Sequence, residues 1–496
     1  MEHLFNCLQQ RSAGILHHLT CLPSDQGIGC LDRNAKNFLD FLQESKIKYW
    51  QVCPLSPTGY GDSPYQSMSS FAGNPYLIDI DYFVTESFLS KEDIKPLTEL
   101  PRERVDFAKL NKLFWPIIFS AVENFLKKNP DEDFNKFKKS TKWLDTFCKF
   151  MALKEYFNQK PWYQWPAEFL SPNTEKFPAD VIKLLNIHKA IQYIFHKQFS
   201  DLKNYAKQNG IKLIGDIPIF PGLDSADVWS NRQIFMFDNE NRPTQVAGVP
   251  PDYFSEFGQL WGNPLYNWQD SKKMNYKWWM KRLERNFELY DVIRLDHFRG
   301  FYNFWAVAFG SETAQNGYWL PGPGLDFFKA IKKKFSKFEC IAENLGDLNQ
   351  DVIAMHKSIG FPGMAVLQFA FSNFSKNSYL PHNQQQNNVM YTGTHDNNTL
   401  RGWFNSLNEM DKHNIRRYVK SDNNSIVQAL INEAYKSTCN TAIICTQDIL
   451  DLDHNARLNT PGTQTNNWCW RMTEDQFSTL KKSTNYLKEL AEIYDR

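Results

Sequence analysis

The sequence lacks an excess of charge of either sign, and it lacks long hydrophobic runs. Its 496 residues include 56 Lys and Arg against 55 Asp and Glu, which gives a formal net charge of +1. This balance gives no reason to expect nucleic acid or an anionic membrane as a partner. No window approaches 18 uninterrupted apolar residues, and the first residues show no basic segment followed by an apolar one. We therefore expect neither a transmembrane helix nor a signal peptide.

The sequence also lacks paired cysteines and the common metal-binding motifs. The nine cysteines are dispersed and include no C-x-x-C pair, which is typical of reduced thiols and favours a cytoplasmic protein. Neither H-E-x-x-H nor His-x-His occurs. His17 and His18 are adjacent, so on a strand they would point to opposite faces and could not both bind one ion. We expect no metal and no cofactor.

Aromatic residues, in contrast, are abundant at 15% of the chain. Tyr and Trp cluster with Asn, Gln, Gly and Pro in two loop-like segments, 59–76 and 250–268. An aromatic face beside polar side chains suits a sugar ring, which has a C–H face and a rim of hydroxyl groups. The alternative is that these rings simply pack a core, so composition alone only suggests a sugar.

Short apolar runs, each ending in polar or turn residues, recur along the chain. Because they are continuous rather than alternating, they predict strands buried on both faces, as in a parallel sheet. Eight such strands with helical crossovers indicate a (β/α)8 TIM barrel, which belongs to the α/β class. The runs are 13–19, 47–55, 211–219, 289–296, 338–344, 363–371, 388–396 and 441–449.

The uneven spacing of these runs predicts insertions. About 155 residues separate the second run from the third, so we expect a mostly helical insertion subdomain at 85–185. A helix is also predicted at 189–209, with Gly210 placed to end it. A loop-rich aromatic insertion follows the third strand at 220–288. The barrel itself is then formed by 1–84 and 186–496.

Charged residues fall at the carboxyl ends of the predicted strands, which is the rim where barrel enzymes place catalytic groups. Alternation along a strand puts Arg294 and Asp296 on the same face, so the guanidinium would keep Asp296 ionised. The other residues at these ends are Asp216, Glu343, His395 and Asp396. Any one of them could instead be a cap or a structural ion pair; together they suggest a site.

Three carboxylates from different strands suggest glycoside chemistry. In a retaining mechanism one carboxylate attacks the anomeric carbon, and a carboxylic acid about 5 Å away protonates the leaving oxygen. The charge of the ionised Asp would raise the pKa of the acid and keep it protonated near neutrality.

Nine segments together resemble the 4-α-glucanotransferases, also called amylomaltases or disproportionating enzymes, of glycoside hydrolase family 77. The resemblance covers nearly the whole chain and rests on their order and spacing. The segments are PLSPTGYGDSPYQS (54–67), FAGNPYLID (71–79), ALKEYF (152–157), IGDIPIF (214–220), GVPPDYFSEFGQLWGNPLY (248–266), IRLDHFRG (293–300), AENLG (342–346), GTHDN (393–397) and NTPGT (459–463).

The resemblance implies roles for particular residues. Asp296 would be the nucleophile, Glu343 the general acid and then base, and Asp396 the stabiliser of the transition state. The sequence departs from the family at Asn344, where Asp usually follows the catalytic Glu. Residues implied to contact sugar or to form a loop arching over the site are Ser63, Tyr65, Asp216, Arg294, His395, Tyr253, Phe254, Gln259 and Trp261.

The implied activity is transfer of α-1,4-glucan segments between donor and acceptor sugars, such as maltooligosaccharides and glucose. Two alternatives remain: an α-amylase-like hydrolase with the same carboxylates, and a noncatalytic glucan-binding protein. A transferase must exclude water and position its acceptor, and the aromatic loop including Trp261 could do both. The sequence does not indicate the oligomeric state.

Overall fold

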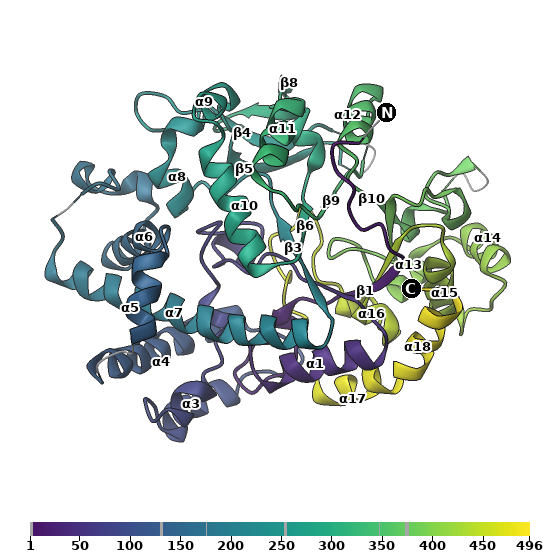
Figure 1. Cartoon of the computed structure of the whole chain (residues 1–496), viewed down its shortest axis with the longest axis horizontal. Coiled ribbons are helices and arrows are strands. Elements are labelled where there is room, and N and C mark those ends of the chain that lie inside the picture. The colour runs from purple at the N-terminus through teal and green to yellow at the C-terminus, as the bar shows by residue number, and fades with distance from the viewer. Residues whose placement is uncertain (1–2, 129–131, 175, 252–254, 347, 373–375) are drawn as a thin grey trace.

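The centre of the molecule is a parallel β-barrel (Figure 1). The computed structural model describes residues 3–128, 132–174, 176–251, 255–346, 348–372 and 376–496. In these ranges eight parallel strands follow the order β10-β11-β12-β1-β2-β3-β6-β9, and each falls within or next to a predicted apolar run. The predicted fold class is confirmed. The strands are β1 Ser12–Leu16, β2 Tyr49–Gln51, β3 Lys212–Ile217, β6 Val292–Leu295, β9 Cys340–Ala342, β10 Gly363–Val366, β11 Asn388–Tyr391 and β12 Thr441–Cys445.

Most strands are shorter than the runs that predicted them. β11 ends at Tyr391, so His395 and Asp396 lie in the loop that follows it and not at the end of the strand itself. β12 ends at Cys445, and the rest of its run, 446–449, forms a short helix. The apolar character continues because these residues still pack inside the protein, although they no longer pair with a neighbouring strand.

The barrel closes between β9 and β10, which share no strand pairing among the described residues. Two hydrogen bonds span this seam instead: the N–H of Ala342 donates to the carbonyl of Pro362 at 2.9 Å, and the N–H of Met364 donates to Oδ1 of Asn344 at 2.8 Å. A Cβ on Gly363 would lie 2.5 Å from Nδ2 of Asn344. Glycine at this position therefore makes room for the side chain that closes the barrel.

The insertion after β2 is mostly helical and gathers on the left of Figure 1. The long helix α7 begins at Ala179, before the predicted start at 189, and ends at Gln208; Gly210 follows with a φ of +72°. Because α7 runs without a break through residue 185, one helix serves both the insertion and the crossover to β3. The division of the chain at 185 stays a prediction. The other helices of the insertion are α3 Lys91–Thr98, α4 Phe107–Lys127, α5 Glu132–Ser140 and α6 Leu144–Tyr156.

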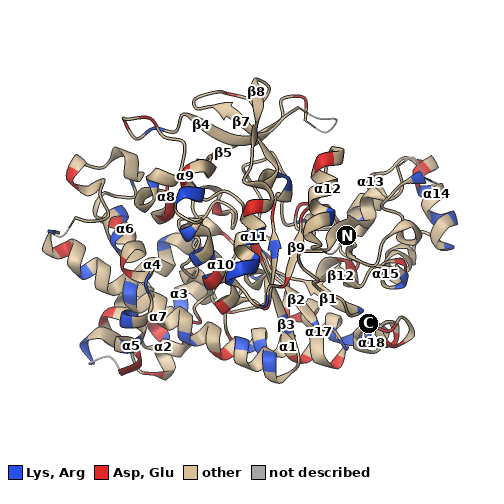
Figure 2. Cartoon of the chain, turned by 45° about the horizontal axis from the view of Figure 1, so that its top comes forward, with Lys and Arg blue, Asp and Glu red and all other residues tan. Residues whose placement is uncertain are grey.

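A second sheet, which the sequence analysis did not predict, stands above the barrel (Figure 2). It has four antiparallel strands in the order β5-β4-β7-β8. Two of them come from the loop-rich insertion, and the other two follow β6. The strands are β4 Gln245–Val249, β5 Gln259–Pro264, β7 Asn303–Ala308 and β8 Gly317–Pro321.

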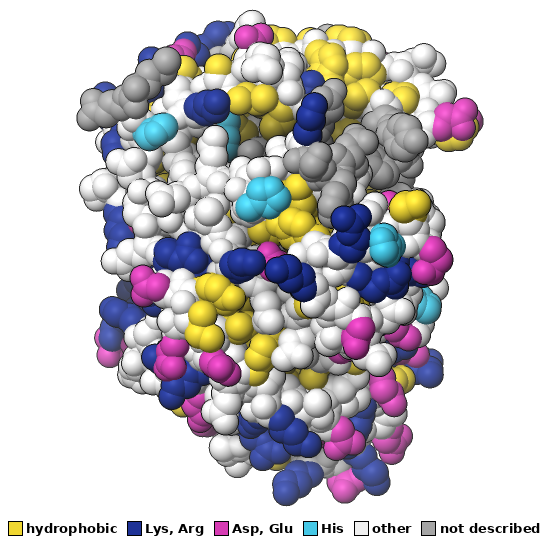
Figure 3. Space-filling view, turned by 90° about the vertical axis from the view of Figure 1, so that its right-hand side faces the viewer, with side chains coloured by type: hydrophobic (Ala, Val, Ile, Leu, Met, Phe, Trp, Pro, Cys, Tyr) yellow, Lys and Arg dark blue, Asp and Glu magenta, His cyan; other side chains and the backbone are white. Residues whose placement is uncertain are grey.

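Most of the remaining helices surround the barrel, and charges of both signs are spread over the helices (Figure 2). The face drawn in Figure 3 likewise carries both signs of charge. No helix of the described ranges combines the length and the apolar character needed to span a bilayer. These helices are α1 Arg33–Glu44, α2 Asp81–Thr85, α8 Ala226–Ser230, α9 Trp268–Lys273, α10 Lys277–Leu289, α11 Gly324–Lys334, α12 Gln350–Ile359, α13 Leu400–Ser406, α14 Glu409–Val419, α15 Ile426–Lys436, α16 Thr446–Ile449, α17 Glu474–Lys482 and α18 Thr484–Ile493.

Candidate active site

Arg294 is the centre of a buried charge network at the carboxyl ends of β3 and β6. Its Nη1 donates to both oxygens of Asp216 at 2.8 and 2.7 Å, and to Oδ1 of Asp296 at 2.8 Å. Strand pairing places Asp216 directly opposite Arg294, and alternation places Asp296 on the same face. Although burial alone would lower the pKa of Arg294, the two carboxylates raise it well above its usual value. The guanidinium is therefore a permanent positive charge.

Tyr65 reaches this network from the loop after β2. Its hydroxyl donates to Oδ2 of Asp216 at 2.9 Å, and its ring stacks on His395 with a centroid distance of 4.8 Å. Ser63 contacts this network only through Tyr65: its Oγ accepts a hydrogen bond from the backbone N–H of Tyr65 at 3.2 Å. Tyr65 thus joins the end of β3 to the loop after β11, and Ser63 shapes the turn that presents it.

Glu343 follows β9 and accepts two backbone hydrogen bonds. The N–H of His297 donates to Oε2 and the N–H of Leu345 donates to Oε1, both at 2.8 Å. His297 adopts the left-handed conformation with a φ of 50°, which is uncommon outside glycine. Burial raises the pKa of Glu343 to about 7, aided by the charge of Asp296 and opposed by Arg294 and the two N–H groups. This carboxyl group can therefore carry a proton near neutral pH.

The pKa of Asp396 is shifted downward, in contrast to that of Glu343. Burial alone would raise its pKa, but the neighbouring His395 and the side chain of Asn459 lower it to about 2. His395 Nε2 lies 3.4 Å from Oδ2 of Asp396, and Asn459 Nδ2 donates to Oδ1 at 2.6 Å. Asp396 is therefore ionised at any pH where Glu343 is titrating.

Three residues of this site were missed by the sequence analysis: Arg457, Asn459 and Trp468. Arg457 donates to the backbone carbonyl of Asp396 at 2.6 Å, and Trp468 packs against His395 with a centroid distance of 5.7 Å. All three lie in the segment after α16, well beyond the last strand. Of the three, only Asn459 had a signal in the sequence, because it belongs to the segment 459–463 that contributes to the family resemblance.

Gln259 and Trp261, predicted to lie in a loop, belong to strand β5 of the second sheet, which brings Trp261 next to the end of β6. Trp261 meets His297 edge to face with a centroid distance of 4.9 Å, and its Nε1 donates to Oε1 of Gln259 at 3.2 Å. Gly258 and Gly262 flank these residues with φ values of +66° and +77°, where a larger side chain would be strained. Tyr253 and Phe254, also predicted here, lie outside the described residues.

Within the described ranges, no three or more His, Cys, Asp or Glu side chains lie together in a way that could hold a metal ion. A parallel barrel that brings a protonatable Glu and an Asp held by a guanidinium to its carboxyl rim, with a Trp side chain beside them, is an arrangement suited to retaining glycoside chemistry. The fold and the site thus define a class of carbohydrate-active barrel enzymes.

Comparisons with known proteins narrow this class. Residues 17–477 match the family model of glycoside hydrolase family 77, described as 4-alpha-glucanotransferase. The chain is 42% identical to the 4-alpha-glucanotransferase of Clostridium butyricum, over 97% of this chain and 99% of the relative. It is 40% identical to that of Streptococcus pneumoniae, over 99% and 98%. The chain therefore belongs to the 4-alpha-glucanotransferase family.

A solved structure agrees with this assignment. The structure of the amylomaltase from Streptococcus agalactiae in complex with acarbose superposes with a TM-score of 0.93 at 38% identity. The match covers 98% of this chain and all of that one (100%).

Proposed function

We propose that the protein transfers α-1,4-glucan segments between maltooligosaccharides by a retaining double displacement. The observation that carries the proposal is the pairing of a protonatable Glu343, with a pKa of about 7, with an Asp296 fixed by Arg294. Retaining chemistry needs one carboxylic acid and one carboxylate side by side. The two strand ends supply this pair.

In the first step, Oδ of Asp296 attacks the anomeric carbon of the donor while the bond to the leaving oxygen breaks. Glu343 gives its proton to that oxygen, and the donor fragment leaves with a free hydroxyl group. Arg294 orients Asp296 through the bond at 2.8 Å, so that the nucleophile is already in place when the donor binds.

In the second step, the now ionised Glu343 takes the proton of an acceptor hydroxyl group. The acceptor oxygen attacks the anomeric carbon, the bond to Asp296 breaks, and Glu343 is protonated again. Since each step inverts the carbon, the product keeps the α-configuration of the donor.

The other site residues bind the sugar in this proposal. Asp396, ionised and held by Asn459, would accept hydroxyl groups of the ring and favour its distortion. Asp216, Tyr65 and His395, which contact one another through Tyr65, would line the same subsite, and Arg294 would hold Asp216 in place. The donors and acceptors are α-1,4-glucans, in keeping with the family and with the acarbose bound by the S. agalactiae amylomaltase.

Transfer is favoured over hydrolysis by the position of Trp261. Its contact with His297 sets an apolar ring next to the residue that follows Asp296, where it would hinder water from reaching the covalent intermediate. The family membership favours the same outcome. A noncatalytic binder would have no use for a carboxyl group tuned to a pKa of about 7.

The covalent step can be tested with Glu343→Ala and α-maltosyl fluoride. Fluoride leaves without a proton, so the first step should proceed, while the second step lacks its base. We expect the intact mass of the protein to rise by one maltosyl residue, and the peptide that contains Asp296 to carry it. Release of fluoride without any adduct, or an adduct on another residue, would contradict the mechanism.

A further inference from the structure

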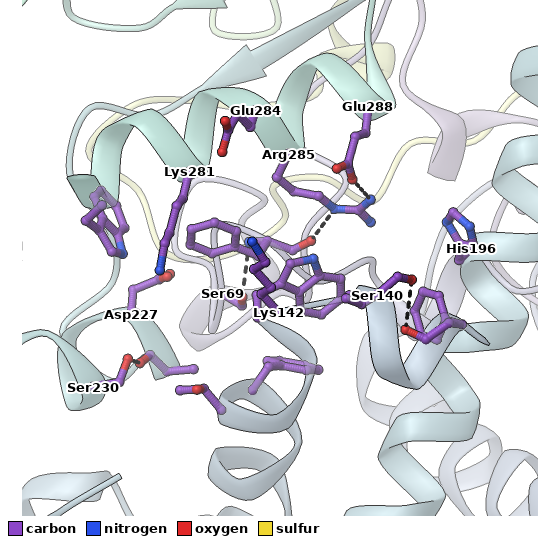
Figure 4. Close-up of a pocket in the computed structure, with 18 of the residues that line it drawn as sticks. Ser69, Ser140, Lys142, His196, Asp227, Ser230, Lys281, Glu284, Arg285 and Glu288 are labelled. Atoms are coloured by element: carbon purple, nitrogen blue, oxygen red, sulfur yellow. Dashed lines mark hydrogen bonds and ion pairs between the residues drawn. The ribbon is translucent and has the colours of Figure 1, made fainter. Parts of the chain in front are cut away.

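A large cavity lies away from the carboxylates, between the helical insertion and the barrel (Figure 4). It has a volume of about 1270 Å³. One wall is formed by α5, the first part of α6 and the middle of α7, and the opposite wall by α10, with α8 at its end. This volume exceeds what a single bound water or ion needs and could admit an organic molecule of substantial size.

Two lysines reach into this cavity from opposite walls: Lys142 from the insertion and Lys281 from α10 (Figure 4). Neither forms an ion pair within the described part of the chain. The other basic groups of the lining are compensated, since Lys136 pairs with Asp133, Lys149 with Asp145, and Arg285 with Glu288. The carboxylate of Glu284 pairs with Lys334 outside the lining. The lining groups left without an ion pair among the described residues are thus these two lysines and Asp227, and their net charge is positive.

The one buried carboxylate of the described lining does not neutralise these lysines. Asp227 is bonded instead to the backbone N–H of Ser70, at 2.6 Å from Oδ2. One oxygen of Asp227 is thus held by the backbone, and no ion pair joins Asp227 to either lysine among the described residues, so an anion could approach both ammonium groups without displacing a partner.

Aromatic side chains, among them Phe71, Trp143 and Trp278, also line the cavity. The guanidinium of Arg285, only 5% exposed, lies over the ring of Trp143 at 5.1 Å, and its Nε donates to the carbonyl of Phe71 at 3.0 Å. Phe71 in turn packs edge to face on Trp278 at 6.1 Å. These contacts fix the aromatic walls between the insertion and α10, so that they form a preorganised surface for a ring.

We propose that this cleft binds a small organic phosphate, in which the phosphate lies between Lys142 and Lys281 and the organic ring lies against the aromatic wall. Ammonium groups are standard partners of phosphate, and a neutral glucan would leave both charges unused. A sugar phosphate and a nucleotide share this chemistry. The bound ligand would bridge the insertion and the barrel.

The proposal can be tested by calorimetry on the full-length protein with glucose 6-phosphate, ADP and inorganic phosphate as separate probes. We expect saturable binding of at least one organic phosphate, tighter than that of inorganic phosphate and weaker at high salt. Lys142→Ala and Lys281→Ala should each weaken it about tenfold, the loss of one charge-assisted contact. The matched control is Lys136→Ala, which removes a lysine already paired within the same lining and should bind as the native protein does.

Several results would overturn the proposal. These are an absence of saturable binding for all three probes, equal affinity of the native protein and both lysine variants, or displacement of the probe by acarbose, which would place binding in the active site. Tighter binding of inorganic phosphate than of both organic phosphates would also contradict the proposal, because it would show that the aromatic wall does not contribute to binding. Unchanged glucan transfer and unchanged melting temperature in the variants would show that the effect is local, and the ratio of the two organic affinities would identify the ligand class.

Discussion

The backbone N–H of His297 donates to Oε2 of Glu343 at 2.8 Å. This bond links the residue that follows Asp296 directly to the proposed acid, so the positions of the two carboxyl groups depend on each other. The N–H of Leu345 holds the second oxygen at the same distance, 2.8 Å. Glu343 therefore has little freedom to rotate, as expected of a group that must face both a leaving oxygen and an incoming hydroxyl group.

The pH dependence should report the protonation of Glu343. Because burial raises its pKa to about 7, the fraction of protein that carries the acidic proton falls as the pH rises through that value. We expect kcat/KM to fall about tenfold per pH unit above it. Glu343→Gln should remove this limb and lower kcat/KM by a factor on the order of 10³. A flat profile from pH 6 to pH 9 in the native protein would refute this assignment.

Asn344 offers a second test of the same group. In Asn344→Asp, a carboxylate oxygen can still accept the N–H of Met364, so the seam of the barrel is kept. The added negative charge next to Glu343 should raise the pKa of Glu343 and shift the basic limb upward by about one unit. The control is Asn344→Ala, which adds no charge but loses the bond across the seam, and should lower the melting temperature. An Asp variant whose limb does not move would count against Glu343 as the titrating acid.

The hydroxyl group of Tyr65 should contribute to kcat/KM through its hydrogen bond to Asp216. Tyr65→Phe removes the donor to Asp216 and keeps the ring that stacks on His395. We expect kcat/KM to fall about tenfold, because a buried carboxylate loses one hydrogen bond. Tyr65→Ala, which also loses the stacking, should be impaired further. Identical kinetics of Tyr65→Phe and the native protein would exclude a contribution of this bond.

The contact of Trp261 with His297 predicts a change in product distribution rather than in rate alone. Trp261→Ala should open the site to water and raise the ratio of hydrolysis to transfer, by several-fold or more. The ratio is obtained from new reducing ends relative to glucosyl units transferred. Leu260→Ala is a matched control, since Leu260 is the exposed neighbour on the same strand. An unchanged ratio in Trp261→Ala would argue against shielding by this residue.

Local patterns explain which parts of this structure were predictable. Continuous apolar runs identified the eight barrel strands, because a strand covered on both faces needs apolar side chains throughout. Alternation along β6 also predicted the pairing of Arg294 with Asp296. Hydrophobicity does not mark where a strand stops pairing, so the end of β11 at Tyr391 was placed too late.

Features that depend on distant parts of the chain were not predictable. The bonds from Arg294 to Asp216 require the register of β3 against β6. Asn459 reaches Asp396 across a loop whose path no local pattern fixes. The antiparallel sheet joins strands on both sides of β6, and its sequence resembles an irregular aromatic segment. In each case the information lies in packing between segments rather than within one.

The central claim is that the carboxylates at the barrel rim transfer glucan segments. The most direct test is incubation of the purified protein with maltotriose, with products resolved by chain length over time and reducing ends counted. We expect glucose together with a ladder of longer oligosaccharides, at a constant number of reducing ends, and no reaction with Asp296→Asn. Glucose and maltose alone, with reducing ends that rise as bonds are cut, would contradict transfer and establish hydrolysis.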